Sequence, residues 1–119
     1  MDDFEVLFYD CPDGRKPAKE FLDGLDTKMR AKMSMMVALL KKNGNRLRLP
    51  YSEHLGDGIF ELRAQAGSDI SRILYFFFVG RQAVLTNGFV KKTQKTPPGE
   101  IELAKKYRKE FLERKERSI

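Results

Sequence analysis

The stretch that decides the fold runs from Ile59 to Val90 and reads IFELRAQAGSDISRILYFFFVGRQAVLTNGFV. It contains three segments rich in β-branched and aromatic residues, at 59–64, 70–79 and 83–90, separated by the turn sequences AGSD and GR. Short turns between such segments are typical of strands that pair with their neighbours along the chain. The sequence therefore predicts that residues 55–91 form three successive antiparallel strands.

The side chains of these predicted strands divide between two faces. In the first segment the alternation places Glu61 and Arg63 on one face, with Phe60 and Leu62 on the other. The second segment is apolar at both odd and even positions, as in a central strand that is covered on both faces of the sheet. Arg72 is the exception. We therefore expect charged side chains near the ends of neighbouring strands.

Toward the N-terminus, residues 4–9 (FEVLFY) predict a first strand, which the turn sequence CPDG ends. Pro17 favours the start of a short helix that Gly24 ends. A second helix, from Asp26 to Asn43, carries methionines and leucines at steps of three and four. This spacing gives the helix an apolar side, which we expect to pack against the apolar face of the sheet.

Toward the C-terminus, the sequence PPGE at 97–100 leads into a last helix. Its apolar stripe consists of Ile101, Ala104, Tyr107 and Phe111. The predicted order is β-α-α-β-β-β-α, which is an α+β fold. The length of 119 residues suits one modest core, so we expect a single domain over residues 1–119.

The composition narrows the classes of function. Basic residues number 23 against 17 acidic ones, and the formal net charge of +6 suits a polyanionic partner. One cysteine and one histidine are too few ligands for the usual soft metal sites. The start, MDDFEVLFYD, does not resemble a secretory signal, and the longest apolar run, Ile73–Val79, is far below the roughly 18 residues of a membrane span. We therefore expect a cytoplasmic protein that does not contact a membrane.

No signature of a familiar catalytic class is present, because GxSxG, a Walker loop, HExxH and paired cysteines are all missing. What remains is a group of charged residues at the ends of neighbouring predicted strands: Glu61, Arg63, Arg72, Lys91, Lys92 and Lys95. When a ribose 2′-hydroxyl attacks its adjacent phosphate, negative charge grows on the phosphate oxygens, and guanidinium groups stabilise this charge. A carboxylate or a lysine could transfer the protons. The same residues could equally be surface solubilisers and strand-end gatekeepers.

Residues 55–104, which read LGDGIFELRAQAGSDISRILYFFFVGRQAVLTNGFVKKTQKTPPGEIELA, strongly resemble the phage-type, HigB-like branch of the RelE/ParE toxins. The resemblance is carried by GDG, ELR, SRILYFF, GFVKKTQKTP and the EI that precedes a helix. The upstream order of a strand, two helices and the segment RLRLP is similar as well. The resemblance implies a RelE-like fold with two N-terminal helices packed on a twisted antiparallel sheet, whose other, concave face holds an RNA-cutting site.

By this resemblance, Arg72 lies where RelE-type enzymes place a phosphate-binding arginine, and Lys92 lies where they carry a basic acid or transition-state residue. We therefore expect these two side chains in one concave basic site, within reach of a single phosphate. Glu61 and Lys91 are further catalytic candidates, although Glu61 stands where RelE has a lysine that is thought to act as base. Arg63 either holds the phosphate together with Arg72 or pairs with Glu61.

Other positions leave the base and the acid open. Asn87 stands where relatives often show a histidine, and nothing at Pro98 replaces the stacking tyrosine of RelE. His54 is the only imidazole, and a lone histidine in a loop is more often structural than catalytic. Five basic residues are candidates for binding the RNA backbone, or else form a solvated surface: Lys41, Lys42, Arg46, Arg48 and Lys95.

The resemblance implies the toxin of a type II toxin–antitoxin system that acts as a metal-independent endoribonuclease on mRNA, with or without the ribosome. It implies no cofactor. The inhibitor that it implies is a helix-turn-helix antitoxin of the HigA type. Two alternatives stay open: a ParE-like inhibitor of DNA gyrase, and a non-catalytic module that binds nucleic acid through its basic surface.

Overall fold

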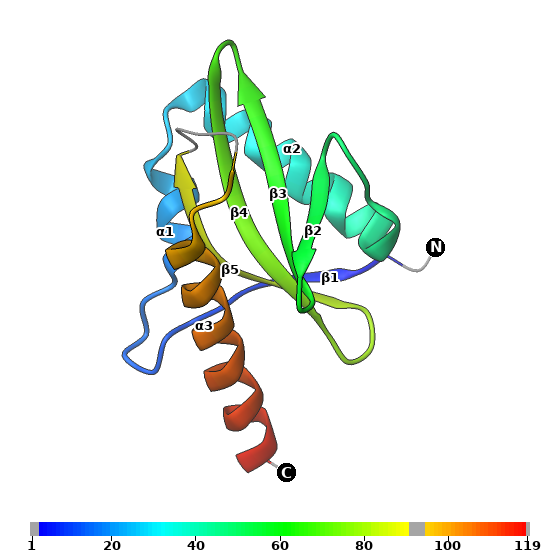
Figure 1. The fold of residues 1–119 in the computed structure, drawn as a ribbon, viewed down its shortest axis with the longest axis vertical. Coiled ribbons are helices and arrows are strands. Elements are labelled where there is room, and N and C mark those ends of the chain that lie inside the picture. Colours follow the sequence, from blue (N-terminus) through cyan, green and yellow to red (C-terminus); the bar gives the residue numbers. More distant parts are fainter. Residues whose placement is uncertain (1–2, 91–94, 119) are drawn as a thin grey trace.

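The computed structural model describes residues 3–90 and 95–118. Within these ranges the chain forms an α+β fold in which a five-stranded mixed sheet, ordered β1-β5-β4-β3-β2, carries helices on both faces (Figure 1). The α+β class is thereby confirmed. No helix of the described part of the chain is long and apolar enough to cross a membrane.

The N-terminal part consists of β1 (Glu5–Phe8), α1 (Pro17–Gly24) and α2 (Thr27–Asn43). Asp26 caps α2, because its carboxylate accepts a hydrogen bond of 2.9 Å from the backbone N–H of Met29. The second helix thus begins directly after the residue that the sequence suggested as its start.

The end of α2 requires a glycine for two reasons. Gly44 has a φ of +54°, a region that side chains other than glycine rarely adopt. A Cβ atom at this position would also lie 1.9 Å from the ring of Phe4. The chain continues through a short 3₁₀ helix, η1 (Gly44–Arg46), toward the far edge of the sheet.

The rest of the sheet is an antiparallel meander of four strands. These strands are β2 (Ser52–Gly56), β3 (Ile59–Ala66), β4 (Asp69–Phe78) and β5 (Gln82–Val90). The hairpin of β3 and β4 extends beyond the end of β2, so that the last residues of β3 lie at the edge of the sheet (Figure 1).

Two hydrophobic clusters sandwich the sheet. The cluster under α1 and α2 includes Met33, Leu40, Leu62, Tyr75 and Leu85. The cluster under α3 (Pro98–Arg117) includes Ile59, Leu74, Phe76, Ala104 and Phe111. Because successive strand residues point to opposite faces, odd-numbered positions of β3 face the α3 side and even-numbered ones face α2. Glu61 and Arg63 therefore lie on the α3 side.

Two details of the predicted architecture were wrong. The meander has four strands instead of three, because β2 precedes the predicted segments, and the order of elements is β-α-α-β-β-β-β-α. The sheet is mixed instead of antiparallel, because β1 pairs in parallel with β5 in a register that joins Glu5 to Gln82. The connection from β1 to the meander crosses the sheet through both helices, and this allows the parallel pairing.

Candidate active site

Four charged side chains lie on the α3 side of three neighbouring strands, and we refer to Glu53, Glu61, Arg63 and Arg72 as the ion-pair cluster. The strand registers place Glu53 opposite Glu61 and Arg63 opposite Arg72. Like charges directly opposite each other destabilise a sheet, so this arrangement depends on contacts along the diagonals.

Two diagonal contacts between strands and one contact along β3 join the cluster into a chain. Arg63 donates from Nη2 to Glu53 and from Nε to Glu61 Oε1, the latter at 3.1 Å. Arg72 Nη1 donates to the same Oε1 atom of Glu61. One carboxylate therefore holds two guanidinium groups, and each guanidinium is fixed in direction by it.

The inner end of the cluster is buried beneath Thr96. Glu61 and Arg72 are 0% and 1% exposed, although both are ionisable. The hydroxyl of Thr96 donates to Glu61 Oε2 and accepts from Arg72 Nη1 at 3.2 Å, so it links the two side chains. Among residues 3–90 and 95–118, Arg72 Nε is buried and has no hydrogen-bond partner. Because an unpaired buried donor is costly, this atom is a place where an anion would gain binding energy.

The outer end of the cluster reaches solvent. The side chain of Glu53 is 43% exposed and that of Arg63 is 24% exposed. A pocket of about 330 Å³ opens beside them and is lined by Glu53, Leu55, Arg72, Lys95, Thr96 and Ile101. The pocket therefore brings an accessible carboxylate next to the buried arginine and a lysine.

A second polar group lies where α3 begins, on the same side of the sheet. Asn87 is 3% exposed, and its Nδ2 donates to the backbone carbonyl of Glu100 at 3.2 Å and to the Glu100 carboxylate at 2.9 Å. Its Oδ1 is buried and has no hydrogen-bond partner in the part of the chain that the structure describes. The asparagine thus ties β5 to the first turn of α3.

The structure brings three of the five predicted catalytic residues together, namely Glu61, Arg63 and Arg72. Of the two alternatives for Arg63, pairing with Glu61 is present. Arg72 is held between Glu61 and Thr96 and lines the pocket beside Glu53. Lys91 and Lys92 lie outside the described residues, so a common site with Arg72 stays a prediction.

The predicted RNA-binding residues fall into two groups. Lys95 lines the pocket beside Thr96. The other four are exposed at the C-terminal end of α2 and just after it, on the opposite side of the sheet from the ion-pair cluster: Lys41, Lys42, Arg46 and Arg48. The guanidinium of Arg48 donates to the carbonyls of Asn45 and Leu47, at 2.6 and 3.1 Å.

Sequence reasoning missed Thr96 and Glu53. Thr96 is 24 residues from Arg72, and no pattern in the sequence indicates that the two side chains make contact. Glu53 belongs to β2, which was not predicted, and the alternation of SEHLG was the only available signal. His54 has a structural contact, because its Nε2 accepts from the backbone N–H of Gly58 at 3.1 Å.

Within residues 3–90 and 95–118, no group of three or more histidine, cysteine or acidic side chains is placed to hold a metal ion. The model of one protein family, described as phage-derived protein Gp49-like (DUF891), matches residues 20–109 of the 119. No curated protein matches the chain. Since the matched range covers most of α1, all of α2, the whole meander and most of α3, the chain belongs to the Gp49-like family of phage-derived proteins, a toxin–antitoxin-associated family related to the RelE/HigB-like toxins.

Proposed function

We propose that this protein is the toxin of a type II toxin–antitoxin pair and that it cleaves mRNA without a metal ion. The membership in a toxin–antitoxin-associated family supports the first part. The second part rests on one observation: two arginines from neighbouring strands converge on one carboxylate beside a pocket that also contains an accessible carboxylate and a lysine.

The proposed reaction is an internal displacement at phosphorus. The 2′-oxygen of a ribose attacks the adjacent phosphate, the bond from phosphorus to the 5′-oxygen breaks, and the products are a 2′,3′-cyclic phosphate and a 5′-hydroxyl. Negative charge grows on the non-bridging oxygens during this step. Arg63 and the unpaired Nε of Arg72 would stabilise that charge from one side, because their guanidinium groups are held in place before the substrate binds.

The reaction also requires a base for the 2′-hydroxyl proton and an acid for the leaving oxygen. Glu53 suits the base, because its carboxylate is accessible and lines the pocket with Arg72. Glu61 suits a positioning role, since its two oxygens are occupied by Arg63, Arg72 and Thr96. For the acid we retain Lys92 from the resemblance, with Lys91 and Lys95 as neighbouring positive charges.

The decisive experiment is primer extension on mRNA from translating ribosomes after induction of the protein in a bacterial host. The wild type should produce discrete new 5′ ends. Arg72→Ala and Arg63→Ala should reduce their yield by about 10²-fold or more, as expected for the loss of one transition-state donor. Arg117→Ala at the exposed end of α3 is the matched control and should cleave normally.

The other outcomes distinguish the rival functions. Gyrase poisoning without new RNA ends would establish a ParE-like inhibitor instead. Salt-sensitive RNA binding without cleavage would establish a non-catalytic module. Full cleavage by both folded arginine variants would reject the site while retaining the nuclease.

We further propose that the inhibitor is a helix-turn-helix protein encoded next to this one. The basic character of the chain, with a net charge of +6, offers an electrostatic target for an acidic partner. Co-expression tests this directly: the neighbouring protein should co-purify and restore growth. A neighbour that does neither would contradict the pairing.

A further inference from the structure

The edge of the sheet next to α2 contains an unfilled strand position. β2 pairs with β3 up to Ser52 opposite Leu62, and the last hydrogen bond runs from the Arg63 N–H to the Tyr51 carbonyl at 2.9 Å. The N–H of Tyr51 turns back to the carbonyl of Arg48 at 3.0 Å. Beyond this point, β3 has a described neighbour only on its β4 side.

The backbone groups of Gln65 point to this open edge. In a strand, both the N–H and the C=O of one residue point to the same side, and this side alternates along the chain. Because the N–H of Arg63 points toward β2, the N–H and C=O of Gln65 point the same way and meet no strand there. The open edge therefore begins after the Arg63 N–H and presents the backbone N–H and C=O of Gln65.

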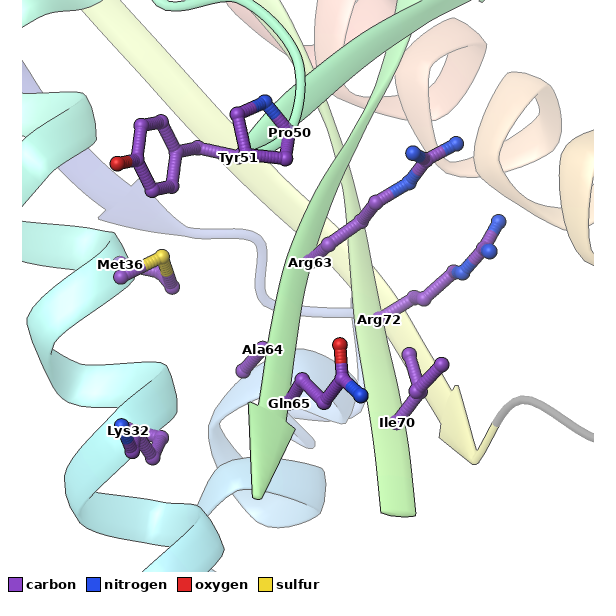
Figure 2. A pocket seen from close by; sticks show the side chains of 9 residues that line it. All are labelled: Lys32, Met36, Pro50, Tyr51, Arg63, Ala64, Gln65, Ile70 and Arg72. Atoms are coloured by element: carbon purple, nitrogen blue, oxygen red, sulfur yellow. The ribbon is translucent and has the colours of Figure 1, made fainter. Parts of the chain in front are cut away.

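A pocket of about 370 Å³ lies along this edge and involves both faces of the sheet (Figure 2). Lys32 and Met36 of α2 form one wall, and Pro50 and Tyr51 form the upper rim. The remaining lining residues belong to β3 and β4: Arg63, Ala64, Gln65, Ile70 and Arg72. A recess that is lined from both faces of a strand suits a guest strand, whose side chains alternate between those faces.

We propose that the free edge of β3 binds an extended segment of a partner protein by strand addition, and that this segment carries alternating apolar and acidic side chains. The backbone of Gln65 would supply the hydrogen bonds. Met36, Tyr51 and Ile70 provide apolar contacts on either side of the guest strand. The charged residues of the described lining are all basic; Arg63 and Arg72 are paired with Glu53 and Glu61, so Lys32 on the α2 wall supplies the positive charge that an acidic side chain would meet. This inference does not depend on the proposed nuclease function.

The geometry favours a peptide over RNA and over a second copy of this chain. RNA would need the guanidinium groups, but Arg63 and Arg72 point away from the α2 wall, toward the α3 side (Figure 2). A second copy of this chain would bring a second Lys32 to the same recess, which costs electrostatic energy. The recess between α2 and Tyr51 also suits one strand better than a folded edge that carries its own helix.

The test starts with selection of peptides from a displayed library of random octapeptides on the full-length protein. The selected peptides are expected to alternate apolar and acidic residues. One selected peptide is then synthesised as the probe for calorimetry and for amide hydrogen exchange. We expect the Gln65 amide to exchange more slowly in the complex, and Lys32→Glu to weaken binding at least tenfold. Lys109→Glu, which makes the same charge change at an exposed position of α3, should bind like the wild type.

Backbone pairing is tested by Gln65→Pro, which removes the open N–H, with Gln65→Ala as the control that retains it. Proline is tolerated on a strand edge whose N–H faces solvent, and the unfolding curve verifies the fold. The proline variant should lose at least tenfold in affinity and the alanine variant should not. Selected peptides without acidic residues, unchanged exchange at Gln65, or competition by an oligoribonucleotide would overturn the proposal. So would concentration-dependent dimerisation that Gln65→Pro abolishes.

Discussion

Arg63 and Arg72 are direct cross-strand partners in β3 and β4, and both guanidinium groups donate to the same oxygen of Glu61. The carboxylate thereby offsets a repulsion that the strand register imposes. Because Glu61 is fully buried, water cannot take over its role as the hydrogen-bond acceptor of the two guanidinium groups. Glu61 therefore stabilises the sheet and also positions the two arginines of the site.

The first prediction is that Glu61→Gln destabilises the protein by about 3–5 kcal/mol, because it leaves the buried Arg72 guanidinium without a counter-charge. Urea denaturation measures the change in the free energy of unfolding. Glu102→Gln, in which the lost carboxylate is 74% exposed and contacts Lys105, should leave stability unchanged. An equal change in the free energy of unfolding for both variants would show that the buried ion pair contributes no more to stability than the exposed one.

The second prediction separates stability from activity. The double variant Glu61→Leu with Arg72→Met replaces the buried pair by apolar side chains of similar size, and such replacements are often neutral or stabilising. We expect the double variant to recover most of the stability that Glu61→Gln loses. It should not cleave mRNA, because it lacks the Arg72 guanidinium. A stable double variant that still cleaves would remove Arg72 from the proposed mechanism.

The third prediction concerns Thr96. Thr96→Val keeps the shape but removes the hydroxyl that contacts Glu61 and Arg72, so the free energy of unfolding should fall by about 1–3 kcal/mol. If Arg72 is positioned through this contact, cleavage should fall as well. Thr96→Ser restores the hydroxyl and should restore both properties. Thr27→Val, at an exposed position at the start of α2, is the matched control for the substitution itself.

The fourth prediction is a pH dependence. Tyr75 donates to or accepts from the Ser52 hydroxyl at 2.5 Å, and burial raises the pKa of Tyr75 from 10.0 to about 12. Because the unfolded chain releases this proton first, the contribution of Tyr75 to stability is complete below pH 10 and is lost between pH 10 and about 12.

Tyr75→Phe lacks this titration, so its unfolding free energy should fall less steeply than that of the wild type between pH 10 and 12. The difference should be of the order of 2–3 kcal/mol, since each pKa unit corresponds to about 1.4 kcal/mol. Denaturation at several pH values measures both curves. Parallel curves would contradict the prediction. At neutral pH the variant should lose only about 1 kcal/mol, for the hydrogen bond.

The fifth prediction concerns the contact between α1 and β5. A Cβ atom at Gly88 would lie 2.3 Å from Cδ2 of Phe21, so Gly88→Ala should cost about 1–3 kcal/mol by overpacking. Gly99→Ala meets nothing within 4 Å and should be neutral or slightly stabilising. Combining Gly88→Ala with Phe21→Leu should recover part of the loss, and a purely additive loss would exclude the ring as its cause.

The elements that could be predicted are those whose signals are local. The hairpin of β3 and β4 followed from its β-prone segments and its turn, and strand parity placed Glu61 and Arg63 on one face. The parity did not predict that Arg72 joins them, because its strand is apolar at both odd and even positions. β2 was missed because it lies at the edge and its sequence SEHLG is mostly polar. An edge strand buries little surface, so its residues are under weak hydrophobic selection.

The rest depends on contacts between distant parts of the chain. The parallel pairing of β1 with β5 results from the path of the crossover, which no sequence window contains. Thr96 reaches Glu61 across 35 residues. The burial of Arg72 could not be predicted, because an arginine at a strand end is usually exposed and becomes buried only when distant partners satisfy it.

The parallel pairing of β1 with β5 has a consequence for the order of folding. Glu5 meets Gln82 only after most of the chain has been made, whereas each hairpin of the meander closes between close neighbours. Closing the longer loop costs more chain entropy, so we expect β1 to join a meander that has already formed. On this expectation, the strands that carry the ion-pair cluster assemble before the N-terminal strand completes the sheet.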